Sequence, residues 1–415
     1  MDRIVILSAG ASTRFWPLAS IHHKAFYRIG TGKTILEETV SGILEEFENP
    51  TEISIVVAPR DFDLAVRLFN DNDKVKVYVQ EKPTGAGQGL LKALKGDFSG
   101  KFMLTTGDKI NAGKILKELA GEDLAHSAGS GQAVALRKTK DPKHYGIVEL
   151  EGDRIKSVTE KPDEGSSPSD SKITSAYLLD SSFLTFVEKH PSDHYSLEIA
   201  LDEYVRENDV KGVFVDEIED TRLKFPWDLL DINQKIQSRK SMQFIDPSAQ
   251  ISKTSVIDGP VYIDKNARVL DFVKIVGPAY IGENALIGDF CLIRKNSYID
   301  KNVTIGSYSE IKNSLIYEGT TVHRNYIGDS VMDENSKIGA GTILANRRND
   351  RGEIKSMIKG ELISSGLDFL GAFIGAGAKT GANSAIMPGR KIGKNANIWP
   401  GKVVLEDVPE EETLK

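Results

Sequence analysis

The segment LSAGASTRFWPLASIHHK, residues 7–24, has the residue types of a phosphate-binding loop. It follows the apolar run RIVIL, and ligands of open α/β sheets bind beyond the carboxyl ends of the strands. Backbone N–H groups in a turn of small residues around Gly10 can hold phosphate oxygens. Arg14 and Lys24 add cations that would stabilise the charge developing on phosphate during in-line displacement. The segment therefore predicts nucleotide chemistry.

A carboxylate follows a second apolar run, FMLTT, in the sequence TTGDKI. Mg²⁺ in phosphate-transfer sites takes one or two carboxylates and completes its shell with phosphate oxygens and water. Asp108 at the end of a buried strand suits that role. The sequence thus predicts a Mg²⁺ site at Asp108.

These residues need a sheet to position them, and the first half of the chain predicts one. Runs rich in β-branched residues alternate with runs of helical spacing, which favours a parallel sheet with helices on both faces. Its carboxyl edge would bring together the turns at residues 10–14, 80–87 and 107–108. The expected strands are 3–8, 52–58, 75–80, 102–106 and 132–137, and the expected helices are 34–47, 61–71, 87–94 and 113–119.

Beyond this sheet, residues 146–162 predict a hairpin that turns at Gly152-Asp153. A mobile surface loop is expected at residues 163–171, because it is rich in Ser, Gly, Asp and Pro. Two further helices are expected over residues 197–208 and 226–240.

The second half changes period. A β-branched residue recurs at every sixth position from Ile245 to Ile311, which fits a triangular parallel β-helix with one inward residue on each of its three faces. The register is interrupted between about Ile316 and Leu370, and it resumes from Ile374 to Ile398. Residues 346–369 are therefore predicted to form a loop that leaves the solenoid, and loops of that length are usually functional.

Composition excludes several classes of function. Charged residues make up 27% of the chain with both signs interspersed and a net charge of −7, so no basic face for nucleic acid is expected. The chain has no apolar run of the roughly 18 residues that a membrane span needs, and its start does not predict a signal peptide. The single cysteine, Cys291, excludes an intramolecular disulfide and indicates a reducing cytoplasm.

An α/β half followed by hexapeptide repeats resembles the bifunctional sugar-1-phosphate nucleotidylyltransferase/acetyltransferases, whose best-known members make UDP-N-acetylglucosamine. The resemblance covers nearly the whole chain and is closest to the archaeal type, some of which are named glucose-1-phosphate thymidylyltransferases. It implies a Rossmann-like nucleotidyltransferase domain over residues 1–240 and a left-handed β-helix acyltransferase domain over residues 241–415. It is strongest in VHRNYIGDSV, KIGAGTILAN and LGAFIGAGAKTGANSAIMPGRKIG.

The family's G-x-G-T-R loop and following P-K step stand here as residues 10–14 and 23–24, with Ser12 and His23 replacing Gly and Pro. We expect Ser12 to be tolerated provided that its φ is not positive. The resemblance implies catalytic roles for Arg14 and Lys24. It also implies that nucleotide binds at Ala9, Gly10, Gln80, Gly85 and Ala86.

Gln80 would face the base, and its amide can pair with a pyrimidine imide through one donor and one acceptor. UTP or dTTP is therefore favoured as the nucleotide. For the sugar phosphate, the family's Y-G and E-K-P steps correspond to Tyr145-Gly146 and Glu160-Lys161.

Two departures concern the nucleotidyl site. The family's N-A-G-like sugar step reads here as residues 174–176, Thr-Ser-Ala. Aligning on Pro226-Trp227 puts Arg222 where the family keeps an Asp as the second Mg²⁺ ligand, and Asp220 lies two residues away. A fixed positive charge at Arg222 would either replace part of the metal's role or weaken nucleotidyl transfer.

For the second half, the resemblance implies transfer of an acetyl group from acetyl-CoA to an amino-sugar 1-phosphate. His323 would be the general base, and Lys337 replaces an Asn of the family motif. Such β-helices form homotrimers through their flat faces, so each acetyl site would use two chains. Sugar phosphate would bind at Arg294, Lys312, Tyr326 and Lys355, and acetyl-CoA at Ala340, Asn346 and Ala376.

The sequence also fits three alternative functions. Arg222, Ser12 and the altered sugar step also fit an acetyltransferase or a sugar-nucleotide-binding protein with a degenerate nucleotidyltransferase domain. The sequence TRFWPL resembles mannose-1-phosphate guanylyltransferases. A non-enzymatic subunit that uses the β-helix only for oligomerisation is the third alternative.

Overall fold

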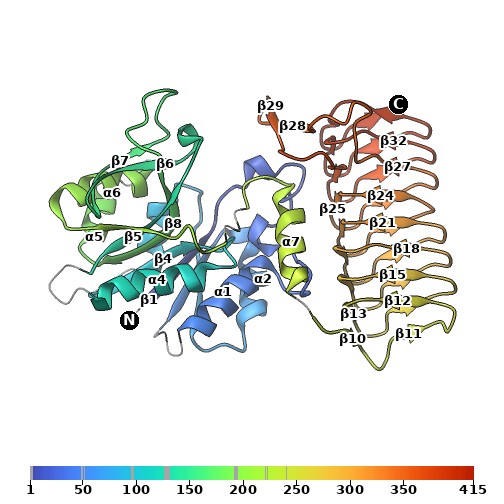
Figure 1. Ribbon diagram of the computed structural model, residues 1–415, viewed down its shortest axis with the longest axis horizontal. Coiled ribbons are helices and arrows are strands. Elements are labelled where there is room, and N and C mark those ends of the chain that lie inside the picture. The colour runs from blue at the N-terminus through green and yellow to red at the C-terminus, as the bar shows by residue number, and fades with distance from the viewer. Residues whose placement is uncertain are drawn as a thin grey trace. The chain divides into compact units, whose positions relative to one another are not determined.

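The computed structural model describes residues 3–47, 50, 52–94, 98–125, 131–190, 195–219, 221, 223–239 and 241–415. The chain forms two compact units (Figure 1). The first comprises residues 1–11 and 35–222, and the second comprises residues 12–34 and 223–415. The predicted domain boundary between residues 240 and 241 stays a prediction. The two compact units are defined by packing, and each of them combines segments that are separated in the sequence. Among the described residues, no helix has the length and apolarity to cross a bilayer.

The first unit is built on a nine-stranded sheet with the order β3-β2-β1-β4-β8-β5-β9-β7-β6. The run β3, β2, β1, β4 is parallel, as predicted, but β8 lies antiparallel between β4 and β5. The sheet is therefore mixed, and the expectation that all of its strands run parallel was wrong. The strands are β1 (Arg3–Ser8), β2 (Ile53–Val57), β3 (Val75–Val79), β4 (Lys101–Thr106), β5 (Ala133–Lys138), β6 (Gly146–Glu151), β7 (Arg154–Glu160), β8 (Ser171–Asp180) and β9 (Lys211–Phe214).

Helices cover both faces of this sheet, as the alternation predicted. On one face, α3, α5 and α6 bury Leu90, Phe183 and Tyr204 against the strands. On the other, α4 packs against α1 and on strands β5 and β8. The helices are α1 (Ile35–Glu46), α2 (Phe62–Phe69), α3 (Ala86–Ala93), α4 (Ala112–Ala125), α5 (Phe183–Glu188) and α6 (Ser196–Glu207). The predicted hairpin is confirmed as β6 and β7, which turn at Gly152.

The second unit contains a parallel β-helix with three faces (Figure 1). The first face consists of β10 (Phe244–Ile245), β13 (Val261–Ile263), β16 (Ala279–Ile281), β19 (Ser297–Ile299), β22 (Leu315–Ile316), β25 (Val331–Met332), β30 (Phe373–Ile374) and β33 (Lys391–Ile392). The second consists of β11 (Gln250–Ile251), β14 (Arg268–Val269), β17 (Leu286–Ile287), β20 (Thr304–Ile305), β23 (Thr321–Val322), β26 (Lys337–Ile338), β31 (Lys379–Thr380), β34 (Asn397–Ile398) and β36 (Thr413–Leu414). The third consists of β12 (Val256–Asp258), β15 (Lys274–Val276), β18 (Leu292–Ile293), β21 (Glu310–Lys312), β24 (Tyr326–Gly328), β27 (Ile343–Leu344), β32 (Ala385–Ile386) and β35 (Val403–Val404).

The inward residues form one continuous apolar core, which confirms the six-residue period. The six-residue register is interrupted in this region, as predicted, but the coils themselves continue to β27, and Ile316 pairs with Met332. Some sides here are one residue shorter, as between Ile311 and Ile316. Each shortened corner turns on one residue with positive φ, namely Asn313, Arg324 or Asp329. The ladder keeps its register because the residue is lost from a corner and not from a strand.

The insertion at residues 346–369 leaves the solenoid between β27 and β30, as predicted. It contains an antiparallel hairpin of β28 (Lys355–Ile358) and β29 (Glu361–Ser364). The base of the hairpin is fixed, since Ile354 is buried and Ser356 Oγ donates to Gly389 O at 2.8 Å.

Residues 12–34 and helix α7 (Asp228–Ser238) also belong to the second unit. They contact the first face, whose outer side carries a ladder of aromatic rings: Phe244, Tyr262, Tyr280, Tyr298 and Tyr317. The ring of Tyr298 is fully buried, whereas that of Phe244 at the ladder's end is 44% exposed.

Candidate functional site

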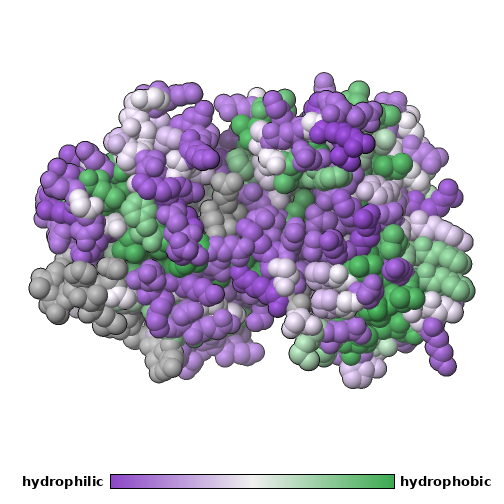
Figure 2. Space-filling view, in the orientation of Figure 1, coloured by the Kyte–Doolittle hydropathy of each residue, from purple (hydrophilic) through white to green (hydrophobic). Residues whose placement is uncertain are grey.

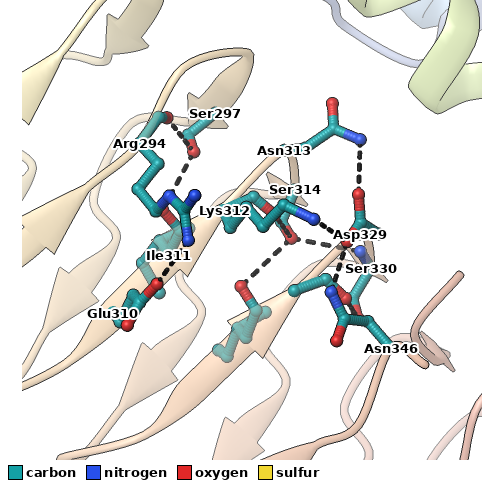
Figure 3. A network of polar contacts seen from close by, with 12 residues as sticks. Arg294, Ser297, Glu310, Ile311, Lys312, Asn313, Ser314, Asp329, Ser330 and Asn346 are labelled. Atoms are coloured by element: carbon teal, nitrogen blue, oxygen red, sulfur yellow. Dashed lines mark hydrogen bonds and ion pairs between the residues drawn. The ribbon is translucent and has the colours of Figure 1, made fainter. Parts of the chain in front are cut away.

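A polar network lies at the corner where the third face leads into the first (Figure 3). Arg294 follows β18, Lys312 ends β21, Asp329 follows β24 and Asn346 lies two residues beyond β27. These strands are neighbours in parallel register, so the residues that end or follow them line up along one edge.

The centre of this network is Asp329, which the sequence interpretation missed. Its Oδ2 accepts from Lys312 Nζ at 2.9 Å and from Asn346 Nδ2, and its Oδ1 accepts from Asn313 Nδ2 at 2.8 Å. The carboxylate is 5% exposed, and three donors compensate for its burial. It fixes Lys312 and Asn346 side by side. Asp329 directly follows β24, and nothing in the sequence around it indicates that it accepts from both side chains.

The predicted phosphate-binding cations Arg294 and Lys312 both form ion pairs. Arg294 Nη1 lies 2.9 Å from Glu310 Oε1, and both side chains are a third to a half exposed. An exposed ion pair of this kind contributes little free energy, so a phosphate can compete with Glu310 for Arg294. The Lys312 ammonium has three donors, which leaves capacity for a phosphate beside Asp329. It also lies 4.4 Å from the ring centroid of Phe369.

Tyr326 lies on the third face beside this edge, in register between Glu310 and Ile343. Its hydroxyl hydrogen-bonds the side chain of Asn346, and burial raises the pKa of Tyr326, which keeps the phenol protonated. Gly328 makes room for both groups, because a Cβ there would lie 2.8 Å from Tyr326 Oη and 2.6 Å from Asn346 Nδ2.

His323 lies at the opposite edge of the third face. It follows β23 at the corner that leads into β24, and its side chain is exposed. The backbone N–H of His323 donates to Asn325 Oδ1 at 2.6 Å. Asn325 is buried and donates to the carbonyls of the next coil, Gly339 and Thr342. Ala340 lies at this same corner in the next coil. The structure thus groups His323 with Ala340, away from the edge of Arg294, Lys312 and Asn346.

Two other predicted residues of the acetyl site lie elsewhere. Ala376 follows β30 at the corner between the first and second faces, so it does not share a corner with Ala340. Lys355 begins the inserted hairpin, and its carbonyl accepts from Arg390 Nη2 at 3.1 Å.

In the first unit, the predicted nucleotide residues follow parallel strands at the carboxyl edge of the sheet. Ala9 and Gly10 follow β1, and Gln80 follows β3. Gln80 Nε2 donates to Gly85 O at 3.0 Å, which ties the glutamine to the turn before α3, where Ala86 begins the helix. One N–H and the carbonyl oxygen of the amide remain for a base.

Asp108 lies one residue after Gly107, beyond the end of β4. Gly107 N donates to Leu7 O at 3.1 Å, and a Cβ on Gly107 would lie 2.1 Å from Ser8 Oγ, so this turn is pressed against the end of β1. Ser8 Oγ is buried without a hydrogen-bond partner among the described atoms.

The residues at this edge fit Mg²⁺ only with help from a substrate. The described part of the chain contains no cluster of three or more His, Cys, Asp or Glu side chains that would hold a metal ion. Asp108 offers one carboxylate, which suffices where phosphate oxygens complete the shell. Asp220 and Arg222, the residues considered for the second ligand position, lie outside the described residues.

The predicted sugar-phosphate residues meet at the root of the β6–β7 hairpin. Gly146 pairs with Glu160, and Lys161 N donates to Tyr145 O at 3.0 Å. Lys161 Nζ lies 3.0 Å from both Glu160 Oε1 and Tyr195 Oη. Although burial opposes it, the hydrogen bonds to Tyr195 and Glu160 raise the pKa of Lys161 and keep it charged. Tyr195 was not predicted.

The altered sugar step lies in β8, where Ala176 pairs with Thr105 of β4. Ser175 has a φ of 56°, and Thr174 Oγ1 donates to Ala135 O at 3.2 Å. This step is therefore close to the end of β4, which leads to Asp108.

Arg14 and Lys24 belong to the second unit, unlike the other nucleotidyl residues. Arg14 lies in the 3-10 turn η1 (Thr13–Phe15), and Lys24 begins η2 (Lys24–Phe26). Ser12 has a φ of 52°, so the condition under which we expected it to be tolerated is not met. His23 caps η2 through Nδ1, which accepts from Ala25 N at 3.2 Å, and this gives the residue in the proline position a local role.

Comparisons with known proteins match both halves of the chain. Residues 3–232 match the nucleotidyl transferase family, residues 275–363 the GMPPB C-terminal domain, and residues 371–406 the bacterial transferase hexapeptide with six repeats. The bifunctional protein GlmU of Methanococcus maripaludis is 38% identical over 94% of this chain and 91% of its own length. The bifunctional sugar-1-phosphate nucleotidylyltransferase/acetyltransferase of Sulfurisphaera tokodaii is 30% identical over 92% of each chain. A solved UDP-glucose pyrophosphorylase complexed with UDP-glucose is 16% identical, with a TM-score of 0.48, over 58% of this chain and 100% of that chain.

Proposed function

The chain belongs to the family of bifunctional sugar-1-phosphate nucleotidylyltransferase/acetyltransferases, and we propose that its N-terminal half joins UTP or dTTP to a hexose 1-phosphate. The observation that carries this proposal is the gathering of Gly10, Gln80 and Asp108 just beyond the carboxyl ends of parallel strands. That edge is where α/β sheets bind nucleotides.

In this reaction a phosphate oxygen of the sugar 1-phosphate attacks the α-phosphorus of the nucleotide, and pyrophosphate leaves. Arg14 and Lys24 stabilise the charge on the transferring and leaving groups. Gln80 faces the base, while Ala9, Gly10, Gly85 and Ala86 form the turns around the nucleotide. Glu160 binds a sugar hydroxyl, and Lys161, held charged beside Tyr195, binds the sugar phosphate together with the Tyr145-Gly146 step. Asp108 would hold Mg²⁺, which when bound neutralises phosphate charge.

We further propose that the β-helix transfers an acetyl group from acetyl-CoA to the amine of an amino-sugar 1-phosphate. The amine attacks the thioester carbonyl, His323 takes the proton from nitrogen, and coenzyme A leaves as its thiol. Arg294, Lys312 and Lys355 bind the phosphate, while Tyr326 and Asn346 orient the sugar and acetyl group. Ala340 and Ala376 belong to the turns assigned to acetyl-CoA. The supporting observation is the network in which Asp329 fixes Lys312 and Asn346 beside Tyr326.

We infer that the enzyme is a homotrimer that works in the cytoplasm. Hydrophobic residues gather on the coil stack (Figure 2). Val256, Ile343 and Val403 on the third face are each about half exposed. Phe272, Phe290 and Tyr308 stack as an exposed ladder at the corner between the second and third faces. Apolar surface on a flat prism face favours packing against a second copy. Cys291 is a buried free thiol, in keeping with a reducing compartment.

The nucleotidyl reaction is tested with four nucleoside triphosphates against glucose, N-acetylglucosamine and mannose 1-phosphates, with pyrophosphate release as the readout. We expect turnover with UTP or dTTP and a large loss in Asp108→Asn. Absence of turnover with every pair would overturn this half of the proposal and favour a degenerate domain.

The acetyl reaction is tested by thiol release from acetyl-CoA with glucosamine 1-phosphate. We expect His323→Ala to lower the rate by about 100- to 10,000-fold while pyrophosphate release is unchanged. An unchanged thiol-release rate in this variant would reject His323 as the base, and no release by the wild type would reject the reaction.

A further inference from the structure

The segment Ser12–Thr34 carries both proposed nucleotidyl cations, yet it packs within the β-helix unit. Apart from the turns η1 and η2, it contains no helix or strand, and only one isolated bridge between Arg28 and Thr34. A segment with so little regular structure takes its order from side-chain partners. Those partners set the positions of Arg14 and Lys24.

A buried link between the segment and the β-helix is made by Tyr27 and Asp333. Tyr27 Oη donates to Asp333 Oδ2 at 2.7 Å and accepts from Ala19 N at 2.7 Å. Both side chains are buried, and the second oxygen of Asp333 accepts from Glu334 N at 3.0 Å. One hydroxyl thus connects the turn at Ala19, which has a φ of 59°, to a carboxylate on the first face of the β-helix.

This link stands next to both cations. Tyr27 follows η2, which begins at Lys24, and its N–H donates to Lys24 O. Its ring lies 6.1 Å from the ring of Phe15, the neighbour of Arg14. Movement of Tyr27 would therefore shift η1 and η2 together.

Other contacts keep the two ends of the segment on the same support. Trp16 Nε1 donates to Glu410 Oε1 at 3.2 Å, and Tyr317 Oη donates to Arg28 O at 2.9 Å. Gly30 N donates to Asn233 Oδ1 at 2.9 Å, and Asn233 in α7 donates in turn to Asn296 O at 2.8 Å. The β-helix and α7 therefore hold the segment along most of its length.

We propose that Tyr27 and Asp333 are positioning residues for nucleotidyl transfer, which hold Ser12–Thr34 on the β-helix in the arrangement that lets Arg14 and Lys24 bind the triphosphate. This inference rests on the proposed roles of Arg14 and Lys24. Charges that stabilise a transition state must be fixed before the reaction, and a displacement of about 1 Å can cost about 100-fold in rate. The β-helix would then serve both reactions, as the acetyl site and as the support of the nucleotide loop.

The test compares Tyr27→Phe and Asp333→Asn with Tyr204→Phe in the full-length protein. Tyr204 is a matched control, since it is a buried tyrosine of the first unit whose hydroxyl lies within hydrogen-bond distance of Gln132 Oε1, at 2.8 Å, and of Asp180 Oδ1, at 3.2 Å. Three quantities are measured: steady-state nucleotidyl transfer, thiol release from acetyl-CoA, and hydrogen exchange of peptides from residues 12–34.

We expect Tyr27→Phe and Asp333→Asn to lower kcat/KM for the nucleoside triphosphate by about 10- to 100-fold, with a raised KM for it. The KM for the sugar 1-phosphate and the rate of thiol release should stay unchanged, and exchange should rise within residues 12–34. The control should change none of these.

Equal loss of both activities in Tyr27→Phe would overturn the inference, because a purely structural defect would spread to the acetyl site. Unchanged kcat/KM and exchange in both variants would overturn it as well. If the wild type releases no pyrophosphate, the proposed nucleotidyl function fails and the catalytic part of the inference falls with it. Hydrogen exchange then decides separately whether the pair holds the segment.

Discussion

Lys312 donates from Nζ to Asp329 Oδ2 at 2.9 Å, and Asp329 is almost completely buried. The same carboxylate accepts from Asn313 and Asn346. One buried acid thus orders three donors at the edge that we assign to the sugar phosphate. The half-exposed pair of Arg294 and Glu310 lies on the same edge and provides a natural comparison.

The first prediction concerns Asp329→Ala. It leaves a lysine ammonium and two amides without their acceptor, so the free energy of unfolding should fall by about 2–4 kcal/mol, and kcat/KM for acetyl transfer should fall with it. Urea unfolding and thiol release measure the two effects. Glu310→Ala is the control and should change the free energy of unfolding by less than about 1 kcal/mol. Equal effects in the two variants would contradict the central role of Asp329.

The second prediction concerns the pH dependence of stability. Burial raises the pKa of Asp333 to about 6, against an unfolded value of about 3.9. The groups that act on it are Tyr27, Glu334 and His22, and Asp333 in turn raises the pKa of Tyr317. Because the folded pKa is the higher one, the folded state binds more protons between about pH 4 and 6. The contribution of protonated Asp333 to the stability of the folded state is complete below about pH 4, and it is lost as the pH rises through about 6.

Asp333→Asn removes this titration. Between about pH 4 and 6 the free energy of unfolding of the wild type should fall by about 1–3 kcal/mol more than that of the variant. Denaturant unfolding at several pH values measures the difference. Parallel pH profiles for the two proteins would show that Asp333 does not titrate in this window.

The third prediction follows from the separation of His323 and Lys312 on opposite edges of the third face. If each acetyl site joins one edge of a copy to the other edge of its neighbour, a mixture of His323→Ala and Lys312→Ala chains contains intact sites. Random mixing in a trimer should restore roughly a quarter of the wild-type thiol release. The controls are the two variants assembled alone, which should be inactive. A mixture that stays inactive would locate the whole site on one chain.

The fourth prediction concerns Gly32→Ala in the segment on the β-helix. Gly32 has a φ of 81°, and a Cβ there would lie 2.5 Å from Tyr280 Oη. Tyr280 has little room to move, because its ring is stacked 5.0 Å from Tyr262 and 4.9 Å from Tyr298. The free energy of unfolding should fall by about 2–3 kcal/mol.

Gly152→Ala is the matched control for this substitution. Gly152 also has a positive φ, of 65°, but a Cβ there would meet no atom within 4 Å. Only backbone strain of about 1 kcal/mol is expected. If the two variants lose equal stability in urea unfolding, contact with Tyr280 is not the cause of the loss.

Local spacing in the sequence determined the main elements of both units. The six-residue recurrence from Ile245 to Ile311 predicted the β-helix, because each side of a coil buries one residue and β-branched side chains fill that position. Strands β1 to β5 were predicted from their short runs of β-branched residues. The turns at Gly10, Gln80 and Asp108 were predicted from their positions after those runs. Parallel strands bring residues that follow them to one edge, whatever lies between them.

β8 was missed although it lies in the middle of the sheet. Its first half, SKITS, contains only one apolar residue, Ile173, so the sequence pattern there is that of a loop and not of a buried strand. The neighbours β4 and β5 bury it on both sides, and they come from earlier parts of the chain. Tertiary packing here overrides the local pattern.

What the sequence by itself determined about this protein is therefore its repeating elements and the edges where its motifs gather. Only the tertiary structure decided that Ser12–Thr34 packs with the β-helix and that Asp329 orders Lys312 and Asn346. The hydrogen bond from Tyr27 to Asp333 joins residues 306 positions apart. Such a contact leaves no period or spacing in the chain, since it depends on which surfaces meet after the elements have formed.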